Sequence, residues 1–185
     1  HRLSSDCGLW LGPRGGYNYF IKFARFLEEN GNGKLNRNSS DICTNHKVYC
    51  EKLKTFFLDC QQRFDVNYWK LDGFSARPPQ PDPQGNYISG GYQGMYYVTE
   101  HWERWIDIFQ AMRNQRGEKR NDLWINLTCY VNPSPWFLQW GNSVWMQNSQ
   151  DIGRLNVKRL SQLDQLLSYR DDRYFDFVKT RAFQF

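Results

Sequence analysis

The sequence predicts an α/β fold, a partial (β/α)8 barrel of the TIM type, in which parallel strands alternate with amphipathic helices. Four short apolar runs are typical of strands that are buried on both faces of a sheet. Between them lie longer segments whose apolar residues recur at helical spacing. This alternation of strand and helix is the pattern of a repeated βα unit with a parallel sheet.

The expected strands are short apolar runs. The first spans residues 7–12, CGLWLG, and Pro13 terminates it. The second spans residues 66–72, VNYWKLD, and is followed by a glycine. The other two are residues 123–131, LWINLTCYV, and residues 143–147, SVWMQ. Proline and glycine after such runs indicate that the chain turns there.

The expected helices span residues 17–30, 46–63 and 96–114, and each carries its large apolar residues on one face. Asp41 is expected to begin the second helical stretch. A loop rich in proline and glycine, residues 76–94, precedes the third helix. The last third of the chain is expected to be helical or irregular.

The number of strands limits the architecture. A closed (β/α)8 barrel takes about 250 residues, whereas this chain has 185 residues and four expected strands. It is therefore either a small open α/β sheet or part of a barrel, and its abrupt end at RAFQF favours a part. Residues 1–185 are expected to form a single domain, and the open strand edges of a partial barrel could support a homo-oligomer.

The amino-acid composition limits the classes of binding partner that we expect. Aromatic residues make up 17% of the chain, which fits an aromatic core and equally a site where flat rings stack on sugars or bases. The formal net charge of +5 is scattered. Its densest basic group, residues 113–120, contains Glu118 and is typical of a solvated helix end. No nucleic-acid partner is therefore expected.

Cysteine and histidine patterns argue against a metal centre. Five cysteines without a CxxC pair fit neither a zinc knuckle nor a disulfide scaffold, and three histidines form no metal-spaced cluster. We expect no metal, no cofactor and, because no apolar run could cross a bilayer, no membrane partner. No signal peptide is visible, but the chain starts at His1 without a methionine, which leaves a removed leader or a longer protein open.

Two carboxylates stand where a parallel sheet gathers its functional groups, beyond the carboxyl ends of strands. They are Asp72 and Asp151. Glycoside hydrolysis needs such a pair, roughly 5 to 5.5 Å apart in retaining enzymes. Lys70 lies two residues before Asp72, shares its face of the strand and would keep it ionised. Asp72 could equally cap a helix or pair with Lys70 for structure, and Asp151 could be an ordinary turn residue.

Several motifs, taken in their order along the chain, resemble those of a known enzyme family. Residues 41–74 are similar to a D-x-T-N-P stretch followed by a D-Y-x-K-W-D strand, with leucine in place of the last tryptophan. The matching residues are Asp41, Thr44, Asn45, Tyr68, Lys70 and Asp72. This segment resembles the one that leads into the nucleophile strand of clan D glycoside hydrolases, the melibiase or α-galactosidase group of family 36.

Three further segments resemble that family. Residues 7–17 are similar to its G-L-W-x-E-P strand, although Gly12 or Arg14 stands near the place of the glutamate. Residues 127–135 resemble its fifth strand, which carries a cysteine followed by a substrate-facing stretch, and Cys129 would be that cysteine. Residues 144–151 resemble the sixth strand, W-x-S-D. There Trp145 fits, Asn148 stands at the spacing of the family's acid, and Asp151 is taken as the acid/base.

The resemblance implies that the chain covers about strands three to six of a glycoside hydrolase catalytic barrel. It implies a retaining α-glycoside hydrolase that acts on terminal α-galactosyl-type sugars through a glycosyl-Asp72 intermediate, without a cofactor. Lys70 would bind sugar hydroxyls and Trp10, Trp136 or Trp140 would stack on the sugar, with core packing as the alternative for each tryptophan. The remaining candidates for substrate contacts are Arg77 and Arg14, which could instead form structural ion pairs, together with Cys129 and Asn148.

Two other functions stay open. The missing glutamate and the displaced aspartate support a non-catalytic carbohydrate-binding or structural remnant of such a barrel. A nucleotide-binding domain is the weaker alternative, because residues 12–17, GPRGGY, form neither a GxGxxG nor a Walker motif. With four strands missing, the isolated chain is expected to have little or no activity. The sugar is not fixed, and a cytoplasmic or a secreted bacterial protein are both open.

Overall fold

The centre of the fold is a sheet of four parallel strands. The computed structural model describes residues 6–15, 20–36, 40–73, 92–117, 120–128, 135–147, 161, 163–165 and 182–184. The parallel strands are β1 (Cys7–Leu11), β4 (Val66–Asp72), β5 (Trp124–Thr128) and β6 (Ser143–Gln147), and they lie side by side in that order. A fifth strand, β7 (Ala182–Gln184), pairs with β6 in the antiparallel direction.

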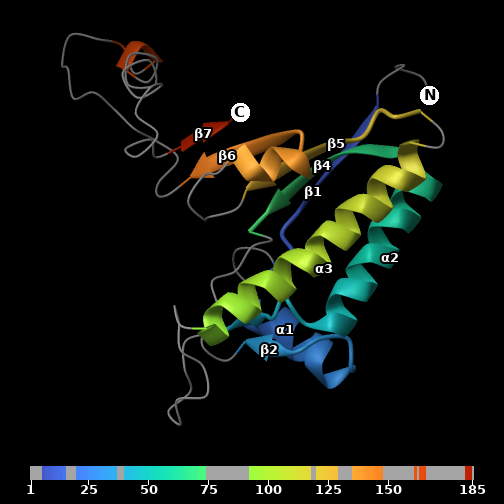
Figure 1. The fold of residues 1–185 in the computed structure, drawn as a ribbon, viewed down its shortest axis with the longest axis vertical. Helices are drawn as coiled ribbons and strands as arrows, with labels where there is room; N and C mark the ends of the chain where they lie inside the picture. The colour runs from blue at the N-terminus through green and yellow to red at the C-terminus, as the bar shows by residue number, and fades with distance from the viewer. Residues whose placement is uncertain are drawn as a thin grey trace.

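Helices connect the strands. The elements before β4 are α1 (Phe20–Glu29), a two-stranded antiparallel ladder of β2 (Leu35–Asn36) and β3 (Asp41–Ile42), and α2 (Lys47–Phe64). A long helix, α3 (Tyr92–Gly117), joins β4 to β5, and the 3-10 helix η1 (Pro135–Gln139) lies between β5 and β6. In Figure 1, α2 and α3 run side by side next to the strands.

The order of the strands agrees with the expected α/β class. Each parallel strand lies next to the parallel strand that precedes it in the chain, and helices connect them, as in a succession of βα units that each add a strand to the same edge of the sheet. An open sheet and an arc of a barrel share this order. The described residues therefore establish a parallel α/β sheet with helices, and closure into a barrel remains a prediction.

The core lies between the sheet and the two long helices. Trp69 and Leu71 of β4 point into it with Ile125 and Leu127 of β5, because alternate residues of a strand face the same side. The Trp69 ring meets the Phe57 ring of α2 edge-on, with 4.8 Å between the ring centroids. From α3, the core receives Trp105, Ile108, Phe109 and Met112. Burial of each such side chain contributes about 1.5–3 kcal/mol.

A network of ion pairs around the buried Arg116 joins the helices to the sheet at the end where the strands begin. Arg116, near the end of α3, is only 3% exposed and pairs with Asp65 and Asp122. Asp65 ends α2 in a left-handed conformation with φ of 57°, and Asp122 precedes β5. Hydrogen bonds from Arg116 lower the pKa of Asp122, so that carboxylate is held ionised. The guanidinium therefore ties three elements together at one point.

Some expected boundaries differ from those observed. Asp41 does not begin a helical stretch: it lies in β3, buried, and α2 begins at Lys47. The ladder of β2 and β3 was not predicted, because strands of two residues carry no periodicity. The expectation that the last third is helical or irregular is wrong at β7, whose three residues pair with β6. No helix in the described part of the chain is long and apolar enough to span a membrane.

Candidate functional site

The two faces of the sheet differ in chemistry. The face that packs on α2 and α3 is apolar, whereas the opposite face carries charged, polar and aromatic side chains. The strand register brings together the side chains of this second face, since paired residues of parallel strands point to the same side. We call it the polar face, and it comprises Gly8, Trp10, Tyr68, Lys70, Asp72, Trp124, Asn126, Thr128 and Ser143.

Asp72 stands at the carboxyl end of β4 and is anchored there. It is 8% exposed, and its Oδ2 accepts a hydrogen bond of 3.1 Å from the indole Nε1 of Trp10. The ammonium of Lys70 lies 5.4 Å from the centre of the Trp10 ring, within the range of a cation–π interaction. Gly73 follows with a positive φ of 68°, which ends the strand directly after the carboxylate. Carboxylate, ammonium and indole thus form one cluster.

Trp10 is not a core residue. Its side chain is 58% exposed even though its indole nitrogen is bonded to Asp72. Packing in the core was the alternative to sugar stacking for this residue, and the structure does not support that alternative. The hydrogen bond holds one edge of the indole at the carboxylate, and the exposed ring offers a flat apolar surface next to that charged group.

Strand β5 adds polar groups that the sequence reasoning missed. Thr128 pairs in register with Asp72, and Asn126 pairs with Lys70. Both are almost fully buried, at 3% and 1% exposure. The signal was present in residues 124–128, WINLT, where these two polar residues alternate with the core residues of the strand.

Arg14 forms a structural ion pair. It follows β1 and binds Asp41, which is completely buried. The hydroxyl of Tyr49 in α2 donates to the carbonyl oxygen of Pro13, the residue before Arg14. Burial raises the pKa of Tyr49, so this hydroxyl remains a donor at neutral pH. Of the two roles expected for Arg14, the structure shows the ion pair.

Trp136 lies with the helices rather than with Asp72. Its ring, in η1, meets the ring of Trp102 in α3 with 5.4 Å between centroids, and the neighbouring Phe137 packs 4.8 Å from the same ring. Because α3 covers the apolar face, these contacts place Trp136 on the other side of the sheet from Trp10. Trp140 also lies in this cluster, 6.2 Å from Trp136. Of the three tryptophans considered for stacking, Trp10 alone belongs to the polar face.

Four of the predicted site residues lie outside the described residues. They are Arg77, Cys129, Asn148 and Asp151. The separation of the carboxyl groups of Asp72 and Asp151, which would test a retaining mechanism directly, therefore stays a prediction. The structure does bring together Lys70, Asp72 and Trp10.

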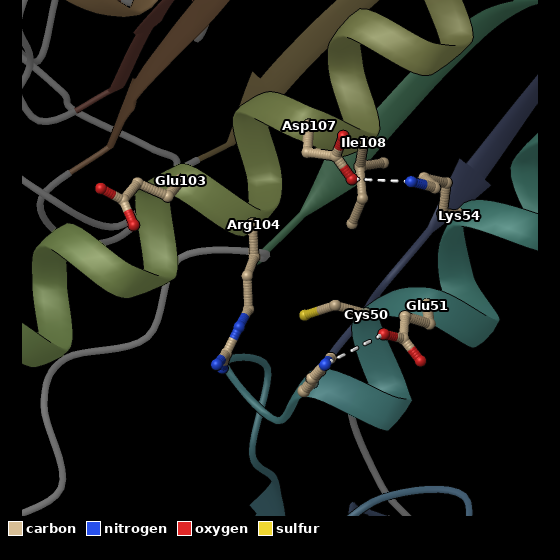
Figure 2. A pocket seen from close by; sticks show the side chains of 8 residues that line it. Cys50, Glu51, Lys54, Glu103, Arg104, Asp107 and Ile108 are labelled. Atoms are coloured by element: carbon tan, nitrogen blue, oxygen red, sulfur yellow. Dashed lines mark hydrogen bonds and ion pairs between the residues drawn. The ribbon is translucent and has the colours of Figure 1, made fainter.

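A pocket of about 410 Å³ opens between α2 and α3, on the helical side of the sheet. Figure 2 shows Lys54 and Asp107 facing each other across it, with 2.7 Å between their charged atoms. The thiol of Cys50 donates to the carbonyl oxygen of Thr44, and burial raises its pKa to about 12, so it is no nucleophile at neutral pH. This pocket is therefore a weaker candidate for a functional site than the polar face, because Lys54 and Asp107 pair with each other and the thiol is unreactive.

The described residues offer no alternative centre for metal chemistry. No group of three or more histidine, cysteine, aspartate or glutamate side chains among them is arranged to hold a metal ion. The cysteines within the described ranges, Cys7, Cys43, Cys50 and Cys60, are free thiols. The polar face is consequently the candidate site.

Comparison with known proteins adds no relative. No family model matches this chain, and neither a curated protein nor a solved structure matches it. What the chain does must therefore be inferred from the residues of the polar face and from the order of its motifs.

Proposed function

We propose that this chain carries the nucleophile of a retaining α-glycoside hydrolase that acts on terminal α-galactosyl-type sugars. The observation that supports this most is the cluster at the carboxyl end of β4, where Asp72 is bonded to Trp10 and shares its face with Lys70. Sites of parallel α/β folds lie at this end of the strands. The order of the sequence motifs supports the same function, because Asp72 occupies the nucleophile position of the family that the chain resembles.

The proposed reaction proceeds in two displacements. The Asp72 carboxylate attacks the anomeric carbon while an acid, which we assign to Asp151, donates a proton to the departing glycosidic oxygen. A water molecule, deprotonated by the same acid/base residue, then attacks the anomeric carbon of the glycosyl ester and releases Asp72. Trp10 orients the carboxylate through its N–H group, and its exposed ring provides a surface for the C–H face of the sugar. Lys70 would donate to sugar hydroxyls.

The proposal is tested by Asp72→Asn in the protein expressed from its complete gene, with aryl α-galactoside and aryl α-N-acetylgalactosaminide as substrates. We expect turnover to fall by about 10⁴-fold or more, as when other enzyme nucleophiles are removed. In Asp72→Gly, added azide should restore consumption of the substrate and give the β-glycosyl azide, because it can attack from the face that the deleted side chain vacates. The control is Asp59→Asn, which changes an exposed carboxylate of α2 that pairs with Arg63.

Unchanged turnover in Asp72→Asn would refute the proposal and place any active site elsewhere. Tight binding of galactose by a wild-type protein that hydrolyses neither substrate would support a non-catalytic carbohydrate-binding module instead. Lost turnover with azide rescue, next to an unaffected Asp59→Asn, identifies Asp72 as the nucleophile.

A further inference from the structure

Strand β5 places two nearly buried polar side chains beside the Asp72 cluster. Thr128 is the register neighbour of Asp72, and Asn126 is the register neighbour of Lys70. Adjacent strands lie about 4.8 Å apart and paired residues face the same side. The hydroxyl and the amide are therefore immediate neighbours of the carboxylate and the ammonium. Trp10 stands on the opposite flank, since it pairs with Lys70 from β1.

Both side chains carry hydrogen-bonding atoms that the fold does not use. Oγ1 of Thr128 and Oδ1 of Asn126 are buried and find no hydrogen-bond partner within the part of the chain that the structure describes. The amide nitrogen of Asn126 donates to Oγ of Ser143 over 2.8 Å.

Buried polar atoms without partners are rare because each one lowers the stability of the fold. They are retained at positions where a ligand or a water molecule completes the hydrogen bond. Two of them on adjacent positions of one face, next to an anchored carboxylate, indicate a ligand and not an accident of packing. Seven further buried polar atoms of the described residues also lack hydrogen-bond partners, Oγ1 of Thr44 and Nε1 of Trp69 among them, but within the described part of the chain only those of Thr128 and Asn126 lie on the polar face beside Asp72.

We propose that Thr128 and Asn126 bind hydroxyl groups of the sugar that occupies the site of Asp72, and this rests on the proposed function. A sugar ring has an apolar C–H face and a rim of hydroxyl groups that both donate and accept. The polar face matches it, with an exposed indole on one flank and a neutral hydroxyl and amide on the other. An anionic ligand such as a phosphate fits less well, because Lys70 is the single cation among the described residues of the polar face and Arg14 is paired with Asp41.

The first test is Thr128→Val, which replaces the hydroxyl with a methyl group of similar size. Two results are expected together. The melting temperature should rise by about 2 °C, because an unmatched buried hydroxyl is removed. The dissociation constant for methyl α-galactoside, measured by calorimetry, should rise about tenfold, because a hydrogen bond to the sugar is lost. A hydroxyl with a purely structural role would give lower stability and unchanged affinity.

Thr44→Val is the matched control. Thr44 is completely buried and its Oγ1 also finds no partner among the described residues, but it lies before α2 and its carbonyl oxygen accepts from Trp105 of α3. We expect this variant to gain stability like Thr128→Val and to bind methyl α-galactoside like the wild type. An equal loss of affinity in both variants would overturn the proposal.

Monodeoxy derivatives of methyl α-galactoside identify the sugar hydroxyl. The wild type should lose about tenfold in affinity for the derivative that lacks the partner of Thr128, whereas Thr128→Val should bind that derivative and the parent sugar equally. A Thr128→Val protein that ranks all the sugars as the wild type does would overturn the proposal, and so would a wild type that binds none of them. If Asp72→Asn hydrolyses the substrates normally while Thr128→Val binds the sugar more weakly, the role of Asp72 as nucleophile is refuted and the contact of Thr128 with the sugar is supported.

Discussion

Buried His101 should make the stability of this protein depend on pH in the mildly acidic range. It lies in α3 at 1% exposure, with its ring 5.5 Å from that of Trp102. Burial, followed by the positive charge of Arg104, lowers its pKa from 6.5 to about 4. The folded protein therefore keeps this imidazole neutral at pH values where the unfolded chain is already protonated.

The difference between the folded and the unfolded pKa of His101 sets the sign and the size of the change in stability with pH. The folded pKa is depressed, so the unfolded state takes up the proton first as the pH falls, and stability declines with it. The decline begins near pH 6.5 and ends near pH 4, at about 1.36 kcal/mol for each pH unit. Between pH 7 and pH 5 the free energy of unfolding should fall by about 2 kcal/mol. Most carboxylates stay ionised in this window.

The measurement is urea unfolding followed by tryptophan fluorescence at pH 7, 6 and 5, for the wild type and for His101→Phe. The phenylalanine keeps a ring in the cavity and cannot be protonated, so its unfolding midpoint should change little with pH. His46→Gln is the control, since the pKa of that less deeply buried histidine is also lowered, first by burial, and this variant should keep most of the slope. A His101→Phe protein with the full wild-type slope would show that other groups cause the pH dependence.

Two further predictions concern the framework of the fold. Arg116→Met should cost about 2 kcal/mol in urea unfolding, because it removes charge-assisted hydrogen bonds from a buried guanidinium to two partly exposed carboxylates. Arg63→Met breaks an exposed pair within α2 and should cost less than about 1 kcal/mol, and equal losses would contradict the role of burial. Gly141→Ala should lower stability by about 1–3 kcal/mol, since its Cβ would meet Leu127 Cδ1 at 2.8 Å. Gly117→Ala, whose added carbon meets no atom within 4 Å beyond its chain neighbours and its own helix backbone, is the comparison without a clash, and a neutral Gly141→Ala would show that Leu127 can move aside.

The sequence predicted those parts of the fold that rest on local patterns. The bounds of β4 and β6 agree with the expected residues 66–72 and 143–147, because each is an apolar run with a clear stop. The three helices were placed with errors of a few residues at their ends, where several residues compete as boundaries. The strands β2, β3 and β7 have only two or three residues, and their pairing depends on distant segments. Such strands leave no local pattern to detect.

In the candidate site, too, the features that rest on local patterns were predicted and those that depend on strand register were not. Lys70 and Asp72 were expected on one face, because residues two apart on a strand always are. The bond from Trp10 to Asp72 joins residues 62 positions apart and depends on the register of β1 against β4, which shifts between Cys7 and Gly8. A shift of this kind cannot be read from the sequence. Thr128 could have been found, since the alternation within β5 assigns it to the face of Asp72.

The network around Arg116 has a consequence for how this protein could diversify. It locks α2, α3 and β5 at the edge of the sheet where the strands begin, whereas the Asp72 cluster lies where β4 ends. Substitutions around Asp72 therefore act far from this network, and mutations of groups far apart usually combine additively. A lineage, or a directed-evolution library, could exchange residues of the polar face while the same buried guanidinium keeps the framework folded.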